Sequence, residues 1–450
     1  MRKFILVSYA FPPVGVVGSL RPYRLCRYLP EKGWIPEVIT ACPRKGINLD
    51  HSLLKDIPSQ IIIHQTKQFD IQLIISQFKN KAKKTSSSRN ESLYKYRLNK
   101  SKQFTDTNIA RPIIKKLKAF ILALFSTPDH QVFWNFFVIL TAIKVFLKEK
   151  GIRFILTTSP PHSSQLGGMI MSFLFRTPLI VDYRDPWTDI NHQKKISTFR
   201  HKFEQLLESA VIKRATKVIS STEAYSTILK TRYNNLRKDK FITITNCFEE
   251  QKFSSIKPIK LPKFTITYLG IFYPHHNPYF FFDALSTCLE IYPELREDIT
   301  LNIIGDGDPT TFDVLRNYKL LDITDITGRL IHECAIQISK SSDLLLLLIG
   351  NSELTPKGWV PSKLYEYLAC KRPILAIVPE GEAARIVRKT KSGYVITSND
   401  RDAIINVIRN EYDRKVNKVT NNDFRQDEKE IYKFSDRYTI NEFVKLFQSI

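Results

Sequence analysis

A chain of 450 residues, 43% of them hydrophobic, is long enough for two or more domains and too apolar to be disordered. Its formal net charge of +24 favours partners that carry phosphate, and its six scattered Cys, without a C-x-x-C pair, indicate neither a zinc site nor a disulfide framework. Residues 1–9 lack the apolar core and cleavage site of a signal peptide, so we expect a cytoplasmic protein.

Strand-like and helix-like segments alternate through the first half of the chain. Apolar runs predict strands at residues 4–9, 36–40, 61–64, 154–157, 179–182, 218–221 and 241–245. Helices are expected at residues 20–32, about 132–150, from Ser163 onward, at 198–214 and at 224–233. This alternation predicts parallel sheets with helices on both faces.

A strongly basic stretch interrupts this pattern. Residues 79–118 hold 13 Lys and Arg but only two acidic residues, Glu91 and Asp106. The stretch could bind the anionic surface of a membrane, or it could be a solvated insertion. No nucleic-acid-binding motif accompanies it, so we do not expect nucleic acid as a partner. The most apolar window, residues 132–147, is too short to span a membrane and predicts a buried or membrane-surface helix.

The second half repeats the alternation after a linker. Strands are expected at residues 264–269, 300–304, 323–327, 344–349, 374–378 and 394–397, and helices at 278–291, 310–319, 332–340 and 441–449. We therefore predict an N-terminal domain (1–246, with the basic insertion), a linker (247–263), a C-terminal domain (264–425) and a helical segment (426–450) packing back toward the N-terminal domain. Ligands of such sheets bind beyond the carboxyl ends of the strands.

Residues 358–378 form the most informative stretch, a loop followed by a short helix and a buried strand. Pro361 and Ser362 favour a helix start, where free N–H groups and the positive end of the dipole suit a phosphate. Glu366 projects away from the leucines of the helix and could accept hydrogen bonds from sugar hydroxyls. The pattern predicts a nucleotide-sugar site, and the alternative is an ordinary helix–strand unit with a solvated Glu.

Two loops in the first half follow strands and carry small or polar residues. Residues 11–19 contain two Gly, which let backbone approach a ligand closely. Residues 157–164 offer hydroxyl groups and His162 at a helix start, although their Ser residues could simply cap that helix.

Two further loops carry charge. Residues 182–189 combine Arg184 and Asp185 with Trp187, whose ring could pack on a sugar. The alternative is an internal Arg–Asp pair that fixes the loop. For residues 305–308, Gly-Asp-Gly-Asp, we favour a tight connection, because no further carboxylates follow at the spacing of a cation-binding loop.

Taken together, these segments resemble the GT-B-fold glycosyltransferases of family 4, and more closely their bacterial polysaccharide-type subgroup. They occur in the order of that family and span nearly the whole chain. The segments that carry the resemblance are residues 8–13 with Gly18, Pro128 and Asp129 with Trp134, residues 157–161, 182–187, 245–246, 268–270 and 361–369.

The resemblance implies two Rossmann-like domains that face each other across a cleft, with the acceptor on the first and a nucleotide-sugar on the second. It implies a retaining hexosyltransferase that needs no metal or other cofactor. A saccharide or lipid-linked acceptor would place the enzyme in cell-surface polysaccharide synthesis, at the inner face of the cytoplasmic membrane. Two alternatives remain open, a GT-B sugar-nucleotide epimerase and a non-catalytic protein that binds a nucleotide or a partner.

The resemblance also implies roles for individual residues. The catalytic residues would be His162, Arg184, Asp185 and Lys363. The donor would be bound by Gly18, Ser19, Gly270, Ser362, Lys363, Leu364 and Glu366. The acceptor and the transferred sugar would be lined by Ser159, Pro160 and Trp187. Within the donor site, Glu366 would hold the ribose hydroxyls and the start of its helix the diphosphate.

The chain departs from the family pattern at three places, of which one, Cys247 in place of a Gly after Asn246, affects only a turn. Gly358 stands where the family has the first of its two Glu residues, so the chain departs from the family at the contact that this Glu makes with the sugar. Residues 275–277 are His, His and Asn where a basic pair is usual. Neutralisation of the diphosphate would then fall on Lys363, Arg21 or Arg184.

Overall fold

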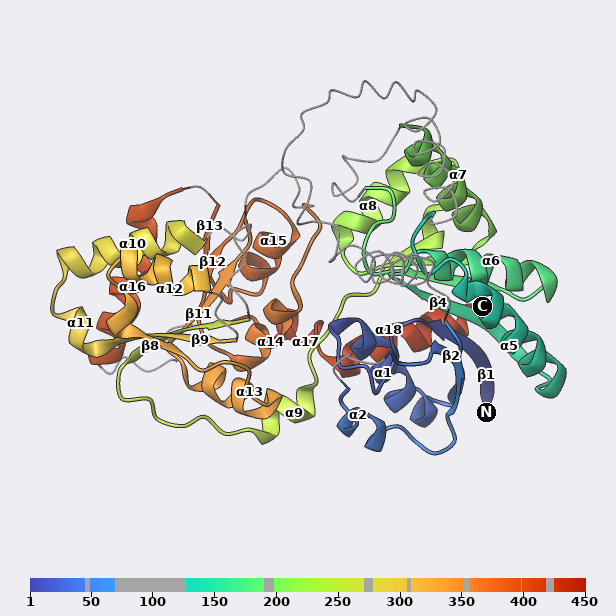
Figure 1. Cartoon of the computed structure of the whole chain (residues 1–450), viewed down its shortest axis with the longest axis horizontal. Coiled ribbons are helices and arrows are strands. Elements are labelled where there is room, and N and C mark those ends of the chain that lie inside the picture. Colours follow the sequence, from blue (N-terminus) through green and yellow to red (C-terminus); the bar gives the residue numbers. More distant parts are fainter. Residues whose placement is uncertain are drawn as a thin grey trace, which may run out of the picture. The chain divides into compact units, whose positions relative to one another are not determined.

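The computed structural model describes residues 1–44, 49–68, 127–189, 198–270, 278–305, 309–350, 357–397, 399–417 and 425–450. The basic stretch 79–118, residues 275–277 and Asp306 to Asp308 lie outside this part of the chain. Two compact units are present, one of Met1–Thr188 and Lys195–Val218 and one of Asp189–Lys194 and Ile219–Ile450. Two parallel sheets, with helices between successive strands, confirm the predicted α/β class (Figure 1).

The first sheet has seven strands in the order β3-β2-β1-β4-β5-β6-β7. These strands are β1 Arg2–Ser8, β2 Trp34–Ala41, β3 Ile62–Thr66, β4 Ile152–Ser159, β5 Leu179–Tyr183, β6 Lys217–Ser220 and β7 Phe241–Thr243. The helices that connect them are α1 Val17–Tyr28, α2 Ser52–Lys55, α5 Trp134–Lys148, α6 Ser163–Leu174, α7 Thr198–Arg214 and α8 Glu223–Arg232. The strand order reverses between β1 and β4, and a ligand site is expected at the carboxyl ends of these two strands.

A buried ion pair fastens α1 to the end of β5. The Nε atom of Arg21 donates to one carboxylate oxygen of Asp182 over 2.8 Å, and its Nη2 donates to the other over 2.9 Å. The side chains are only 6% and 1% exposed. Gln165 on α6 donates to the carbonyl oxygen of Asp182 over 3.1 Å, so three elements meet at this residue.

The second sheet has six strands in the order β10-β9-β8-β11-β12-β13. They are β8 Phe264–Leu269, β9 Ile299–Ile304, β10 Thr324–Ile326, β11 Leu344–Leu348, β12 Ile374–Ile377 and β13 Gly393–Ile396. The remaining helices are α9 Glu250–Ser255, α10 Pro278–Ile291, α11 Leu295–Asp298, α12 Pro309–Asn317, α13 His332–Ser341, α14 Ser362–Cys370, α15 Glu382–Lys389, α16 Arg401–Val416, α17 Glu428–Tyr432 and α18 Asp436–Gln448. Here the strand order reverses between β8 and β11.

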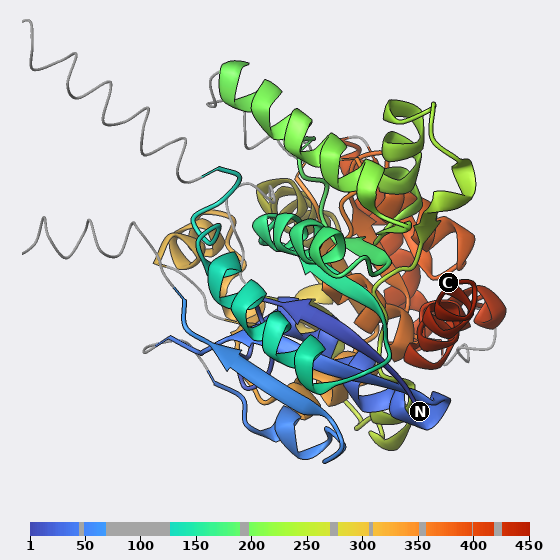
Figure 2. The same ribbon diagram turned by 90° about the vertical axis from the view of Figure 1, so that its right-hand side faces the viewer.

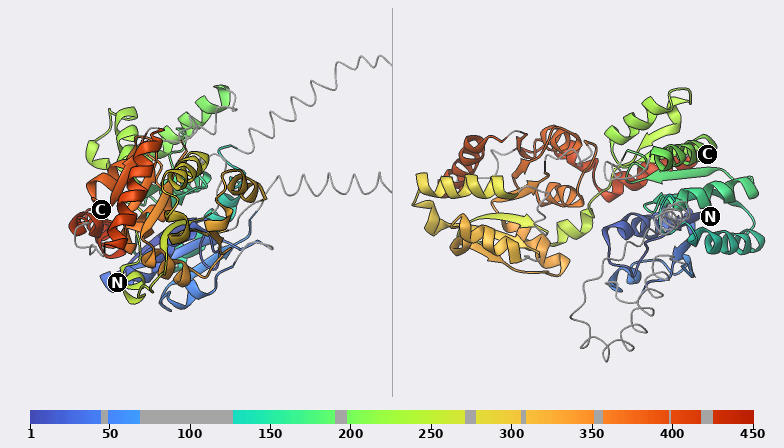
Figure 3. Two further views of the ribbon diagram at one scale, coloured as in Figure 1. Left: turned by 90° about the vertical axis from the view of Figure 1, so that its left-hand side faces the viewer. Right: turned by 45° about the horizontal axis from the view of Figure 1, so that its top comes forward.

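The run of five leucines in β11 shows why this strand is central. Its side chains alternate between the two faces of the sheet, and both faces are buried. Leu344, Leu346 and Leu348 enter one core cluster, in which α10 and α16 pack together (Figure 3). Leu345 and Leu347 enter the other cluster, which contains α14 and α15. A strand buried on both faces needs the continuous apolar run that predicted it.

The structure corrects the sequence-based assignment in several places, and the short helices α2 and α11 are among the elements that were not predicted. The predicted linker contains the helix α9, which buries Phe253. The last helix begins at Asp436 instead of Asn441, because the Ser435 hydroxyl caps it by accepting from the N–H of Tyr438. The helices α15 and α16 were not predicted, although Asp400 caps α16 in the same way. None of the helices in the described residues is long and apolar enough to cross a membrane.

Replacing Asp182 by Asn should destabilise the protein by about 3–5 kcal/mol, because the Arg21 charge would stay buried without its counter-charge. Urea unfolding followed by circular dichroism measures this. The matched control is Asp313→Asn, which breaks an exposed pair with Arg316 and should cost less than about 1 kcal/mol. Equal losses in the two variants would contradict the role given to the buried pair.

Candidate functional site

The first candidate site is built around α14, whose start lies near the switch point of the second sheet. The buried hydroxyl of Tyr367 holds the helix there. It accepts from the N–H of Leu269 at the end of β8 over 2.9 Å and donates to the carbonyl of Leu346 in β11 over 3.2 Å. Burial raises the pKa of Tyr367, so the hydroxyl keeps its proton and can serve as donor and acceptor together.

The first turn of α14 offers backbone donors. Pro361 precedes it in an extended conformation and provides no side-chain cap. The N–H of Leu364 already donates to the carbonyl of Pro361 over 3.1 Å, so Leu364 is not a free donor as the sequence suggested. Ser362 and Lys363 keep N–H groups that bond to nothing in the described residues, as is usual in a first helical turn. Two backbone donors, not three, are therefore left for an anion.

Lys363 sends its side chain to the end of β8. Its Nζ atom lies 4.0 Å from the centre of the Tyr268 ring. Burial lowers the pKa of Lys363 to about 7, although the Glu366 carboxylate opposes this shift. The ammonium lies on a ring face and makes no hydrogen bond to a described residue, so its three N–H donors are available to an anion bound beside it.

Gly270 makes room for this lysine. Its φ of +120° is a conformation that other residues rarely adopt, and a Cβ there would lie 3.2 Å from Nζ of Lys363. Gly305, after β9, packs directly against the backbone of Gly270. The interpretation of residues 305–308 as a tight connection stays a prediction, because Asp306 to Asp308 lie outside the described residues.

Glu366 lies one turn further along α14 and is partly exposed. Its Oε1 atom lies 3.2 Å from Nε2 of His332, the first residue of α13. The contact leaves Oε2 and further lone pairs of the carboxylate available as hydrogen-bond acceptors. The structure thus places Lys363, Glu366 and Gly270, three residues of the donor site that the resemblance implies, in one cluster with His332 and Tyr268.

Gly358 is explained by packing. A Cβ at this position would collide with the ring of Tyr225 on α8, another residue of the second unit. Tyr225 is buried, so its ring cannot simply turn aside. The family pattern has a carboxylate at the position of Gly358, and the structure has no room for that side chain.

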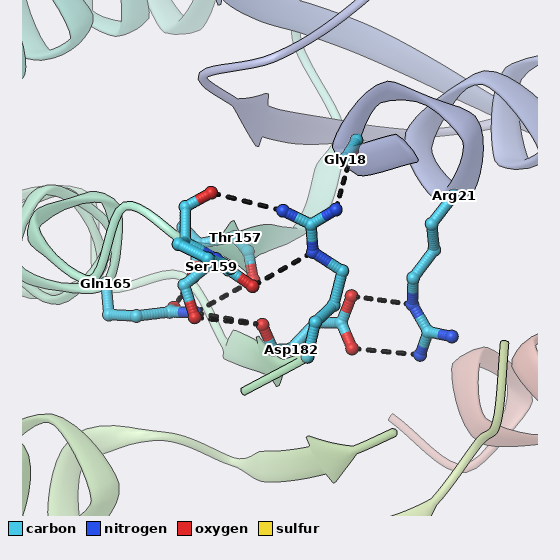
Figure 4. A network of polar contacts seen from close by, with 8 residues as sticks. Gly18, Arg21, Thr157, Ser159, Gln165 and Asp182 are labelled. Carbon is cyan, nitrogen blue, oxygen red and sulfur yellow. Dashed lines mark hydrogen bonds and ion pairs between the residues drawn. The ribbon is translucent and has the colours of Figure 1, made fainter. Parts of the chain in front are cut away.

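The second candidate site lies in the first unit, where loops follow β1, β4 and β5. Arg184 ties these loops together through backbone carbonyls. Figure 4 labels Gly18 and Ser159, two of the residues that accept hydrogen bonds from Arg184. Its Nη1 donates to the carbonyl of Gly18 over 2.7 Å, its Nε to that of Ser159 over 3.0 Å and its Nη2 to that of Pro160 over 3.2 Å. Burial lowers the pKa of Arg184, an effect that Asp182 and Asp185 oppose. The guanidinium therefore holds the loops in position by donating to carbonyl oxygens, which carry no formal charge.

His162 and Trp187 stack on each other beside this network. Their ring centroids are 5.6 Å apart and the ring planes differ by 4°. Trp187 is buried, so the expected sugar platform is covered in this structure. Burial, reinforced by the charge of Arg184, lowers the pKa of His162 to about 3. Its imidazole is neutral at physiological pH, and its buried Nδ1 has no hydrogen-bond partner among the described residues.

Some of the remaining residues predicted for this site make contacts that stabilise the fold, and others are accessible to solvent. The Ser19 hydroxyl donates to the carbonyl of Val16 over 2.7 Å, and Ser159 is fully buried. Pro160 is exposed, and Asp185 is half-buried. Burial raises the pKa of Asp185, against the effect of Arg184. The Arg–Asp pair, given above as the alternative interpretation of this loop, is present as an electrostatic interaction, and three hydrogen bonds of Arg184 go to backbone carbonyls.

Capping of α6 uses a residue from outside the helix. Asp129 accepts from the Ser163 N–H over 2.8 Å and from its hydroxyl over 2.6 Å. Such capping fixes the turn that carries His162. Within the described residues, no group of three His, Cys, Asp or Glu side chains is placed to hold a metal ion.

The residues that the sequence did not single out are Tyr268, Tyr367 and His332. Tyr367 could have been found, because it lies on the apolar side of a short helix with a hydroxyl that needs partners. Tyr268 stands within a segment that carried the resemblance but had no role assigned. His332 gives no local signal, because only the fold brings it to Glu366.

Comparison with known proteins identifies the architecture. Residues 263–413 match the family described as glycosyl transferases group 1. Sucrose-phosphate synthase from Thermosynechococcus elongatus is similar over 100% of this chain and 99% of its own, with 13% identity and a TM-score of 0.60. The lipopolysaccharide outer core galactosyltransferase WaaB is similar over 100% of both chains, with 12% identity and a TM-score of 0.56.

Another similar structure is a UDP-GlcNAc 2-epimerase from Methanocaldococcus jannaschii, which covers 100% of both chains with 10% identity and a TM-score of 0.54. No curated protein matches the chain. At such identities the structures establish the fold, which is GT-B. The resemblance to GT-B glycosyltransferases is therefore confirmed, with the family match lying in residues 263–413.

The low pKa of His162 predicts a pH-dependent loss of stability. Between about pH 6.5 and pH 3 the unfolded chain binds a proton at this residue and the folded chain does not, so acid favours unfolding. His162→Phe should reduce the slope of unfolding free energy against pH by up to about 1.4 kcal/mol per pH unit in this window. Unfolding at several pH values measures this, with exposed His51→Phe as control. An unchanged slope would contradict the assignment.

Proposed function

We propose that this protein is a glycosyltransferase that moves a sugar from a nucleotide-sugar to a saccharide or lipid-linked acceptor. The observation that carries the proposal is the cluster of Lys363 and Glu366 on α14, at the switch point of the second sheet. The cluster lies within the segment that matches group 1 glycosyl transferases. The finer elements of the proposal are retention at the anomeric carbon and a role in cell-surface polysaccharide synthesis.

The donor is held from two sides of α14. The N–H groups of Ser362 and Lys363 and the positive end of the helix dipole bind the diphosphate. The Lys363 ammonium adds a full charge to these partial ones. Glu366, one turn away, accepts from the ribose hydroxyls while His332 holds its other oxygen. Phosphate and ribose are thus recognised by groups one helical turn apart.

Chemistry on this proposal consists mainly of stabilising the leaving group. As the bond between sugar and diphosphate breaks, negative charge grows on the phosphate oxygens beside Lys363 and the helix start. These groups are already in place, so they need not reorganise during the reaction. The mechanism requires no metal, because the positive charge comes from the protein.

The acceptor is assigned to the loops around Arg184 in the first unit. The Arg184 hydrogen bonds hold Ser159 and Pro160 in place, and the phosphate charge is left to Lys363. With a pKa of about 3, His162 is too weak a base to take the proton of an acceptor hydroxyl near neutral pH. Proton transfer to the leaving phosphate itself fits this environment better.

Epimerisation of a sugar nucleotide is the competing reaction, because an epimerase shares the fold. Gly358 is the reason to test this alternative. The transferase pattern has a carboxylate at this position, and the ring of Tyr225 leaves no room for one. Incubation with a panel of sugar nucleotides without acceptor, followed by NMR of the sugar, separates the two. A new stereoisomer of the intact donor would replace our proposal by the epimerase.

Glu366→Ala should weaken binding of a nucleoside diphosphate about 10- to 100-fold, because hydrogen bonds to a charged partner are lost. A thermal-shift screen of nucleoside diphosphates and sugar nucleotides, followed by calorimetry on the best ligand, measures this. The matched control is Glu290→Ala, an exposed carboxylate on α10, which should bind like the wild type. If no nucleotide stabilises the wild type, or if Glu366→Ala responds equally, the donor site is wrong.

Donor affinity should depend on pH through Lys363. The free amine has a pKa of about 7, and a bound diphosphate favours the charged form and raises that pKa. Affinity for a sugar nucleotide should therefore be constant below about pH 6 and fall by up to about tenfold per pH unit above pH 7. Lys363→Arg, which keeps its charge, should bind without this decline up to pH 9. Parallel declines in both proteins would count against Lys363 at the diphosphate.

A further inference from the structure

The outer faces of α5, α6 and α7 are unusually apolar for helices that cover a sheet. Neighbouring α5 and α6 pack side by side, and α6 contacts α7 (Figure 2). Eight large apolar side chains on these three helices are exposed, namely Phe136, Leu140, Leu147, Ile170, Phe173, Leu174, Phe199 and Leu206. We call this set the apolar face. Leu147, Phe173 and Leu206 are 79%, 77% and 69% exposed, so they contribute little to the core.

The exposed positions follow helical periodicity. On α5, Phe136, Leu140 and Leu147 share one side of the helix with Lys144. On α7, Phe199 and Leu206 share a side with Lys202. The outward sides of α5 and α7 are therefore mixed apolar and basic stripes, where an ordinary surface helix would be polar.

The three helices expose no acidic side chain, and the part-exposed Glu149 that follows α5 is paired with Lys3. The sequences of α5 and α6 contain none, and the two on α7, Glu204 and Glu208, are completely buried. Glu204 accepts from Arg200, and Glu208 accepts from the hydroxyl of Thr188. The charges exposed on the three helices and just after α6 are all basic, at Lys144, Lys148, Arg176, Lys202, Lys213 and Arg214.

We propose that the apolar face is a docking surface for a lipid bilayer that contains anionic lipids. Large exposed apolar groups are costly in water and mark an interaction surface when they gather on adjacent elements. A bilayer interface offers acyl chains for the Phe and Leu side chains and anionic headgroups for the Lys and Arg side chains beside them. The absence of exposed acid on the three helices fits a partner of uniformly negative charge. The surface lies apart from residues 79–118 in sequence and does not depend on the proposed donor site.

Vesicle flotation of the full chain tests the proposal. Wild type should float with vesicles of phosphatidylcholine containing about one third phosphatidylglycerol and bind pure phosphatidylcholine weakly. The triple variant Leu147→Gln, Phe173→Gln, Leu206→Gln should partition to the mixed vesicles at least about tenfold less. Because these side chains are exposed, its melting temperature should stay that of the wild type. Reversal of charge at Lys144, Lys148 and Lys202 to Glu should weaken binding most at low salt.

A matched control removes the same kind of group elsewhere. Ile259, Ile291 and Val416 are exposed in the second unit, and their replacement by Gln should leave vesicle binding unchanged. Failure of the wild type to bind anionic vesicles would overturn the proposal. Full vesicle binding by the triple variant Leu147→Gln, Phe173→Gln, Leu206→Gln would also overturn the proposal. If replacing the basic residues of 79–118 by Gln then abolished vesicle binding, that stretch would be the docking surface instead.

A second copy of the chain is the other occupant to test. If the wild type sediments as a dimer without lipid and the triple variant as a monomer, the apolar face is a dimer contact and the proposal fails. Flotation is measured without nucleotide, so either result leaves the proposed glycosyltransferase activity to be judged on its own experiments.

Discussion

The hydroxyl of Tyr367 is the contact on which the candidate donor site depends. It joins β8 and β11, the two strands between which the order of the second sheet reverses, and it does so from within α14. Because the hydroxyl is buried, each of its hydrogen bonds is made at a fixed position and cannot be exchanged for water. The start of α14, and with it Lys363, is thereby set relative to the sheet edge before any ligand arrives.

Positive charge is used differently in the two candidate sites. Arg184 gives its hydrogen bonds to three backbone carbonyls and so orders loops that come from three strands. Lys363 has a ring face below it and no hydrogen bond to a described residue. An arginine with a rigid fork of donors suits the first task, and a lysine whose charge responds to its surroundings suits the second. The chemistry of the two side chains therefore supports ligand binding at Lys363 and a structural role at Arg184.

Much of the fold could be predicted because its signals are local. The apolar runs of β8 and β11 and the helix start at Pro361 lie within a few residues of the elements they specify. Contacts across the chain have no such signal. The partner of Glu366 is a histidine on another helix, and the partners of Arg184 are carbonyl oxygens, which every residue carries. The sequence therefore indicates which residues are candidates, while only the fold shows whether a charge is paired, covered or available.

Gly358 shows how packing can explain a departure from a family pattern. Tyr225 fills the space that a side chain at this position would need, so glycine there follows from the position of α8. In the described residues from Lys357 to Cys370, Glu366 is the single acidic residue. A sugar held near this helix must then find its remaining hydrogen bonds on other elements. The packing of one aromatic ring thus accounts for the absence of a side chain at a position where the family pattern has a carboxylate.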